Sequence, residues 1–221
     1  EVERAGIADF VKRLGLFRLR AKATITDRSA DFAVFVTWGG PAPAIAGAVT
    51  FADPRLAELG THLFVPVGAE PAETATLDAW QAHRIGLGVP ESGLDFALGE
   101  VFPHDVDMDD LGGVDFKKGC FVGQEVVSRM KHRGTARKRT ILARALDPTG
   151  ELPPVGAEIV AGGKGLGTLG SSAGDRALAL VRVDRVKEAL DTAAEITADG
   201  VAVDLALPAF ARFGWPEGTA E

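Results

Sequence analysis

The chain has 221 residues, of which 46% are hydrophobic and 25% are charged, and its formal net charge is −7. This composition is typical of a globular protein and excludes a disordered or collagen-like chain. No apolar run approaches the roughly 20 residues that cross a bilayer and no signal peptide is visible, so we expect a cytoplasmic protein with no membrane partner. The single cysteine allows no internal disulfide, and it cannot hold an iron–sulfur cluster, which needs about four thiolates.

The first part of the chain is predicted to be an α+β layer with an antiparallel sheet. Apolar residues at helical spacing predict a helix over residues 2–14. Alternating, β-rich segments predict strands over 20–26 and 32–38, with a turn between them. Two further strands are expected over 46–52 and 62–65.

A second helix is predicted over residues 74–87, with Thr74 as its N-cap and Gly88 as its stop. Trp80 is interpreted as a core residue of this helix. Arg84 lies near the end of the helix, where it either stabilises the C-terminal dipole or holds a ligand carboxylate.

Residues 103–116 are rich in aspartate and contain an Asp-x-Asp-x-Asp run that starts at Asp105. This spacing is similar to that of a calcium loop, but Asp110 and Phe116 stand where such a loop needs glycine and glutamate. The four histidines form no close metal-ligand pair either, so we expect no metal site. The aspartates can instead neutralise neighbouring lysines, and Asp105 is the carboxylate that we select as a ligand contact.

The only cysteine, Cys120, lies between two glycines, follows Lys117-Lys118 and precedes a predicted helix over residues 123–132. Cations and a helix N-terminus lower the pKa of a thiol, so we expect an activated thiol with a pKa below its free value. The alternative is a small buried residue at a loop–helix junction.

Three polar residues near the start of that helix are candidates for the same site. Glu125 and Arg129 are four residues apart, which is the spacing of a surface ion pair. The alternative is that Gln124 and Glu125 shape the loop around the thiol, where helix amides bind anions.

The net charge hides an uneven distribution. From Lys117 to Arg144 only Glu125 opposes nine basic residues, so this segment carries +8 and the rest of the chain −15. A basic strip on an acidic protein favours a local anionic ligand over nucleic acid, which the rest of the surface would repel. The alternative is a solvated helix face and strand edge. The strip comprises Lys117, Lys118, Arg129, Lys131, Arg133, Arg137, Lys138, Arg139 and Arg144.

The C-terminal part is predicted to be a small, mostly β domain. Gly165-x-Gly167-x-x-Gly170 spells a dinucleotide-binding fingerprint, but a strand pattern follows it, so we interpret these glycines as parts of a tight hairpin. The expected strands cover residues 140–146, 177–183, 195–197 and 201–207.

Residues 118–129 carry a family resemblance. They read K-G-C-F-V-G-Q-E-V-V-S-R, which resembles the signature of the YgfZ-type folate-binding proteins, relatives of the glycine-cleavage T-protein (aminomethyltransferase). The likeness extends over about residues 10–208. The signature positions are Lys118, Gly119, Cys120, Phe121, Gly123, Gln124, Glu125 and Arg129.

The resemblance implies a fold and a ligand. It implies a T-protein-like folate-binding α+β region over residues 1–135 and a C-terminal β-barrel over residues 136–221. It also implies tetrahydrofolate, with or without a polyglutamate tail, as the cofactor, and iron–sulfur enzymes or assembly proteins as partners. Cys120 is then the catalytic candidate. The candidate folate-binding residues are Lys118, Arg84, Asp105, Gln124, Glu125 and Arg129.

Two departures from the T-protein pattern bear on function. The T-protein anchors its pterin through the glutamate of an Arg-Leu-Glu-Ala-Gly segment, and Gly86 stands at that position here. The catalytic aspartate of the T-protein would fall upstream of Glu1. Glu1 itself lies at a predicted helix that the family places inside its first domain. We therefore expect the chain to be a fragment.

Three hypotheses about function follow. The first is a tetrahydrofolate-binding accessory protein that supports iron–sulfur enzymes through Cys120 and the basic strip. The second is a folate-dependent one-carbon transferase like the T-protein. The third is a non-catalytic interaction module in which the cysteine only packs.

Overall fold

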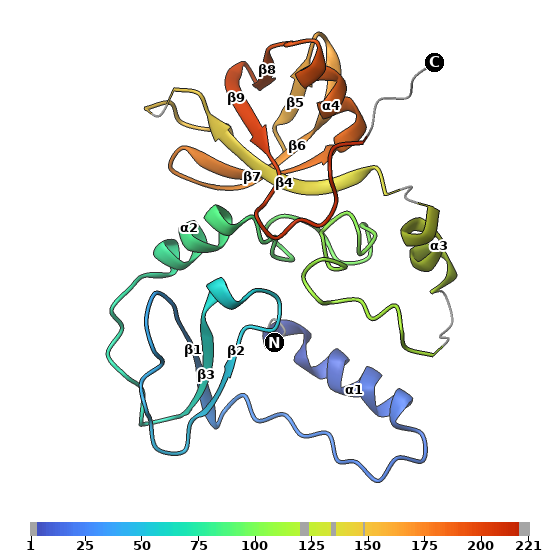
Figure 1. Ribbon diagram of the computed structural model, residues 1–221. Helices are drawn as coiled ribbons and strands as arrows, with labels where there is room; N and C mark the ends of the chain where they lie inside the picture. The colour runs from blue at the N-terminus through green and yellow to red at the C-terminus, as the bar shows by residue number, and fades with distance from the viewer. Residues whose placement is uncertain (1–3, 120–123, 134–135, 148, 217–221) are drawn as a thin grey trace. The chain divides into compact units, whose positions relative to one another are not determined.

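The computed structural model describes residues 4–119, 124–133, 136–147 and 149–216. The chain divides into two compact units, which Figure 1 shows with their elements labelled. The first unit comprises Glu1–Asp53 and Gly60–Ala72, and the second comprises Pro54–Leu59 and Glu73–Glu221. An antiparallel sheet in the first unit and a closed barrel in the second confirm the predicted α+β class with a C-terminal barrel.

The first unit is built on a three-stranded antiparallel sheet with the order β1-β3-β2. The central strand β3 (Thr61–Pro66) pairs with β1 (Phe32–Thr37) on one side and with β2 (Val49–Ala52) on the other. All three strands overlap the ranges predicted for them. Gly60 precedes β3 with a φ of +100°, and a Cβ there would lie 2.0 Å from the carbonyl oxygen of Thr37, so the close approach of β1 requires glycine.

Helix α1 (Ile7–Arg18) follows a 3-10 turn, η1 (Arg4–Gly6), and extends four residues beyond the predicted end at residue 14. None of its residues is buried. The strand predicted over 20–26 is wrong, because no strand among the described residues pairs with this segment. Side-chain alternation is not sufficient for a strand, since the backbone also needs a partner for its hydrogen bonds.

The second unit contains a closed antiparallel barrel with the strand order β4-β7-β6-β5-β8-β9. Strands β4 and β9 pair to close it, for example at Ala143↔Leu205. Its core consists of small and branched apolar side chains, among them Ile141, Ile159 and Leu169. The strands are β4 (Lys138–Ala145), β5 (Glu158–Ala161), β6 (Lys164–Ala173), β7 (Arg176–Arg182), β8 (Ile196–Ala198) and β9 (Val201–Ala206).

The glycine-rich fingerprint lies within β6 and not at a strand–helix turn, so the context for dinucleotide binding is absent there. The hairpin before β6 is made by Gly162 and Gly163, both with positive φ, which corrects the assignment of that turn to Gly165 and Gly167. Gly167 has a different role. A Cβ there would lie 2.1 Å from the carbonyl oxygen of Leu180, so glycine allows β7 to approach β6.

Helix α2 (Leu77–Leu87) ends at Gly88 as predicted, in a left-handed conformation with a φ of 85°. Its N-cap is Thr76, whose hydroxyl accepts a hydrogen bond from the Ala79 amide at 3.2 Å, and not Thr74. Trp80 packs against a small apolar cluster formed by Leu59, Val89 and Leu111, as expected for a core residue.

The boundary between the compact units falls near residue 72, and the barrel begins with β4 at Lys138. Helix α2 belongs to the same unit as the barrel because polar contacts join them, such as the bond from Arg84 to Ser171 at 2.9 Å. Helix α4 (Val183–Asp191) was not predicted, although Val183 and Val186 give it a buried apolar face. No helix in the described part of the chain is long and apolar enough to cross a membrane.

Candidate functional site

Cys120 lies outside the described residues, so its predicted pKa and its placement stay predictions. The described residues nearest to it are Gly119 before it and Gln124 after it. Lys118 Nζ donates a hydrogen bond to Gln124 Oε1 at 3.0 Å, so two candidate residues from opposite sides of the cysteine lie together. Beside them is a small hollow of about 60 Å³, whose lining includes Phe116 and Val127.

Helix α3 (Glu125–Arg133) begins close to the predicted start, directly after Gln124. The side chains of Glu125 and Arg129 are exposed, and no ion pair joins them among the described residues. The surface-pair explanation of this spacing is therefore not supported. Both side chains stay available to a ligand.

The basic strip is less continuous in the fold than in the sequence. Arg139 is buried and forms two hydrogen bonds with the Asp109 carboxylate, at 2.6 and 3.1 Å. Lys131 lies 3.7 Å from Asp109, and Arg144 donates a 2.7 Å bond to Asp175. Within the segment from Lys117 to Arg144, Glu125 is the only acid. The acids that pair with these basic residues come from distant segments of the chain.

Arg84 lies in a closed network and does not face a ligand. It is only 1% exposed, and its guanidinium donates to Gln81, to the Val89 carbonyl, to Asp95 at 2.7 Å and to Ser171. All of its donor groups are thus used within the second unit. Arg84 thus clamps α2 to the barrel, and its position in the last turn of the helix agrees with the predicted role at the C-terminal dipole, whereas its role toward a ligand stays a prediction.

Asp105 is also engaged in local structure. It is 7% exposed, and its carboxylate accepts a 3.0 Å bond from the Phe102 amide. Its backbone carbonyl accepts a bond from the Thr140 hydroxyl on β4. These contacts anchor the acidic segment to the barrel, which the sequence did not reveal.

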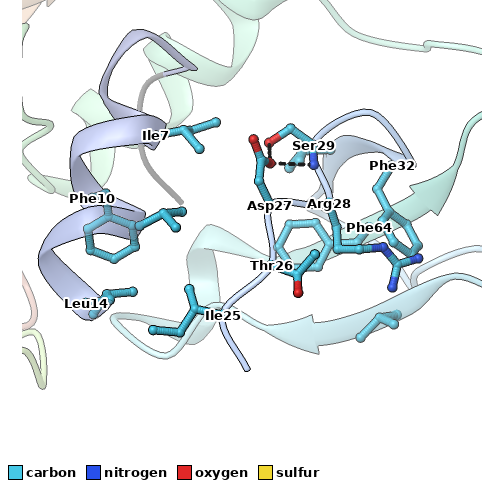
Figure 2. Close-up of a pocket in the computed structure, with 13 residues that line it drawn as sticks. Ile7, Phe10, Leu14, Ile25, Thr26, Asp27, Arg28, Ser29, Phe32 and Phe64 are labelled. Atoms are coloured by element: carbon cyan, nitrogen blue, oxygen red, sulfur yellow. Dashed lines mark hydrogen bonds between the residues drawn. The ribbon is translucent and has the colours of Figure 1, made fainter. Parts of the chain in front are cut away.

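The first unit contains a second candidate site, an open cavity of about 690 Å³ between α1 and the sheet. Figure 2 shows Ile7, Phe10 and Leu14 of α1 facing the cavity from one side. Phe32 of β1 and Phe64 of β3 contribute aromatic rings from the other side. No single sequence motif indicates this cavity, because its walls come from four separate segments.

Polar groups lie at one edge of the cavity. The Asp27 carboxylate accepts bonds from the Ser29 amide at 2.9 Å and from the Ser29 hydroxyl at 2.5 Å, as drawn in Figure 2. The bond from the Ser29 hydroxyl, and to a smaller extent the bond from the Ser29 amide, hold the pKa of Asp27 below its usual value. Arg28 pairs with Asp31 and lies over the ring of Phe32, 5.2 Å from its centroid. An apolar, aromatic cavity with one ionised carboxylate suits a flat ring that carries hydrogen-bond donors.

Comparison with known proteins identifies the barrel. Residues 137–213 match the family model described as CAF17, C-terminal beta-barrel domain. The barrel is therefore similar to the C-terminal domain of CAF17. The match covers β4 to β9, the strands that close on one another in the second unit.

Two proteins that this chain resembles carry consistent names. The chain is 38% identical over 141 residues to "Iron-sulfur cluster assembly factor IBA57 homolog, mitochondrial" of Mycosarcoma maydis, which covers 60% of this chain and 34% of that protein. It is 30% identical over 191 residues to the human "Iron-sulfur cluster assembly factor IBA57, mitochondrial", covering 80% of this chain and 54% of that protein. The chain thus spans about a third to a half of the length of these relatives.

These findings bear on two expectations. The CAF17 barrel and the IBA57 relatives belong to the folate-binding superfamily of YgfZ and the T-protein, so the resemblance drawn from residues 118–129 is confirmed. The expectation of a cytoplasmic protein is wrong, because these relatives are named as mitochondrial proteins. A compartment is specified by an address that a receptor recognises, and the composition of a folded domain does not carry it.

Proposed function

We propose that this chain supports iron–sulfur cluster assembly as a tetrahydrofolate-binding accessory protein. The observation that carries the proposal is its similarity to proteins named as iron–sulfur cluster assembly factors, which in the human case extends over 80% of the chain. An accessory role fits the sequence better than a carrier role, because one cysteine cannot supply the thiolates of a cluster. Its partners are assembly proteins or the enzymes that receive clusters.

A complementation experiment tests this role. In cells that lack their own IBA57-type factor, the chain should restore the activity of iron–sulfur enzymes. Cys120→Ser should abolish the rescue while leaving the protein folded, since the change is nearly isosteric. Circular dichroism and the soluble amount of the variant serve as controls. Full rescue by the serine variant would show that the thiol is not needed, and no rescue by the unaltered chain would contradict the proposal.

We place the ring of the folate in the cavity of the first unit. The cavity of about 690 Å³ is within the usual range for small-ligand sites, and Phe10, Phe32 and Phe64 can cover the faces of a flat ring. The Asp27 carboxylate supports this assignment, because the amino group and ring N–H of a pterin donate hydrogen bonds in parallel. Asp27 would supply the pterin-binding carboxylate that the T-protein has at the position of Gly86.

Calorimetry with tetrahydrofolate tests the assignment. Asp27→Asn should weaken binding at least tenfold, because it removes a charge-assisted bond of about 1.5–3 kcal/mol. Asp147→Asn is the matched control. Asp147 accepts the same pair of bonds, from the amide and hydroxyl of Thr149, but lies in the other unit. If the two variants bind tetrahydrofolate with equal affinity, the ring does not bind in this cavity.

A separate proposal concerns the second unit alone, in which the exposed basic residues near Cys120 bind an anionic polyglutamate chain. Lys117, Lys118 and Arg129 remain exposed, unlike Arg139. Affinity should therefore rise with the number of glutamates and fall with salt, since exposed charges are screened within about 10 Å at 0.1 M ionic strength. Binding that is insensitive to both would contradict a role for these residues without affecting the cell experiment.

A further inference from the structure

The second unit contains a buried cluster of charged groups that the proposed function does not use. His104, Asp107 and Asp109 belong to the turn-rich segment before Phe116, and Arg139 comes from β4. The exposed fraction is 0% for His104 and Asp107, 7% for Asp109 and 5% for Arg139. Such groups are almost never buried unless they are paired, so each contact in the cluster is informative.

The contacts divide the cluster into a paired half and an unpaired half. Arg139 Nη1 and Nη2 bind the two oxygens of Asp109 at 2.6 and 3.1 Å, while Arg139 Nη1 reaches Asp107 Oδ1 only at 3.4 Å. Asp109 is therefore the ion-pair partner of the guanidinium, and Asp107 is a second carboxyl group beside a charge that is already used.

Several buried polar atoms in the cluster lack a hydrogen-bond partner among the described residues. They are both ring nitrogens of His104, Oδ2 of Asp107 and Nε of Arg139. A buried polar atom without a partner is costly and calls for an explanation. A proton on Asp107 Oδ2 lowers this cost, because it removes a buried negative charge.

Charge counting leads to the same assignment. When His104 is neutral, the two carboxyl groups are balanced by the Arg139 guanidinium and by the Lys131 ammonium group, which lies 3.7 Å from Asp109 on the exposed side. Asp105 and Asp110 from the same segment add two negative charges that these cations do not offset. The arrangement therefore favours one additional proton within the cluster.

The cluster is in contact with the residues that precede Cys120. The ring of His104 packs against Phe116 with 6.1 Å between centroids, and Lys131 Nζ lies 5.4 Å from the centroid of the same ring. Phe116 is two residues before Lys118, which binds Gln124 across the cysteine. Movement of the acidic segment would therefore change the support of this loop.

We infer that His104, Asp107 and Arg139 form a buried site that binds one proton and thereby keeps the segment before Cys120 closed. The proton resides on Asp107. Loss of the proton leaves a buried carboxylate whose partner, Arg139, is 3.4 Å away and already bound to Asp109, and the segment from His104 to Phe116 opens to hydrate it. The site would make the bond between Lys118 and Gln124 responsive to pH.

The pH range follows from the two titrating groups. Burial, partly offset by Arg139, raises the pKa of Asp107 to about 8, and burial lowers the pKa of His104. An acid with a raised pKa binds its proton more tightly in the folded state, so its stabilisation is lost as pH rises toward 8. His104 acts in the opposite sense and only below its ordinary pKa of about 6.5. Between pH 6.5 and 8.5 Asp107 therefore acts alone.

Hydrogen exchange of the whole chain tests the inference. In the unaltered protein, protection of amides in residues 104–116 should fall about tenfold between pH 6.5 and 8.5, after correction for the intrinsic exchange rate. Asp107→Asn should abolish this fall, because the amide does not titrate. Asparagine also tolerates the positive φ of 56° at this position, so the variant should fold. An infrared carbonyl band of a protonated carboxyl group should be present at pH 7 and absent from the variant.

Two further variants make the result decisive. Asp199→Asn is the matched control, since Asp199 also has a positive φ, of 44°, but is exposed in the β8–β9 turn. It should behave like the unaltered protein. His104→Gln should keep both the infrared band and the fall in protection, because the proton is on Asp107. Protection that does not change with pH in the unaltered protein, or an infrared band that persists in Asp107→Asn, would overturn the inference.

Discussion

At the scale of single residues, burial decides what a charged side chain does. Arg84 and Arg144 are both arginines that pair with an aspartate, but their side chains are 1% and 60% exposed. Water solvates Arg144 when its partner is removed, whereas Asp95, at 4% exposed, has no such replacement for Arg84. The two residues therefore offer a direct comparison.

Arg84→Gln should destabilise the second unit strongly. The change leaves the buried Asp95 carboxylate unpaired and removes the bond to Ser171, for an expected loss of about 3–5 kcal/mol in the free energy of unfolding. Arg144→Gln should leave the denaturation midpoint nearly unchanged. Urea titration followed by circular dichroism measures both. Similar midpoints for the two variants would contradict the assignment of Arg84 as a buried clamp.

The candidate residues show which parts of a site can be predicted. The pairing of Lys118 with Gln124 lies where the signature drew attention, because both residues flank one short loop. Arg84 and Asp105 were also selected, but the fold uses them for packing between segments. Their partners, Asp95, Ser171 and Thr140, are far away or unremarkable in the sequence, so spacing alone could not assign these roles.

At the scale of helices and strands, local chemistry set most boundaries. Gly88 ends α2 because a left-handed residue without a Cβ satisfies the last carbonyls, and this was predicted. The start was predicted two residues too early, at Thr74, since two threonines compete for the cap. Only the position relative to the first amides, as for Thr76 and Ala79, decides between them.

The two threonines provide a test of this cap. Thr76→Ala should lower the free energy of unfolding by about 1 kcal/mol, because it removes the acceptor of the Ala79 amide. Thr74→Ala should have no measurable effect, since Thr74 is exposed and lies before the helix. Thermal denaturation compares them. A larger loss for Thr74→Ala would place the cap where the sequence first suggested it.

Elements that depend on partners were harder to predict. Residues 20–26 alternate like a strand but are not one, because the described residues supply no neighbour. Conversely, α4 was not predicted, because its apolar stripe is short. Packing against the barrel core, which buries Val186 and Ala189, stabilises this helix. Both errors arise from tertiary contacts that local sequence does not contain.

At the scale of the whole molecule, the two units differ in the size of their cores. The barrel buries a continuous apolar cluster, whereas the buried apolar residues among those described in the first unit are Leu63 and Val65. Helix α1 buries none of its residues. Few buried contacts favour local opening, so the first unit should be the less stable one.

Hydrogen exchange should show this difference directly. Amides of β4, β6 and β7 should be at least about 100-fold more protected than those of β1 to β3. Saturating tetrahydrofolate should raise protection in α1 and the sheet, because a ligand that binds only the folded state stabilises it. Unliganded units with equal protection would contradict the assignment of stability to the barrel core.

The sequence by itself determined the α+β class, the barrel strands β4, β7, β8 and β9, and the family resemblance, because alternation, turn residues and the run from Lys118 to Arg129 are local patterns. Strands β5 and β6 were not predicted. Tertiary structure alone decided which charges are buried and what they pair with. Arg139 looks like part of a basic strip until β4 places it against Asp109, and Asp107 looks like one aspartate among several until its neighbours exclude water. Burial and pairing depend on segments that meet only in the fold, and these two quantities set the charge state of a residue.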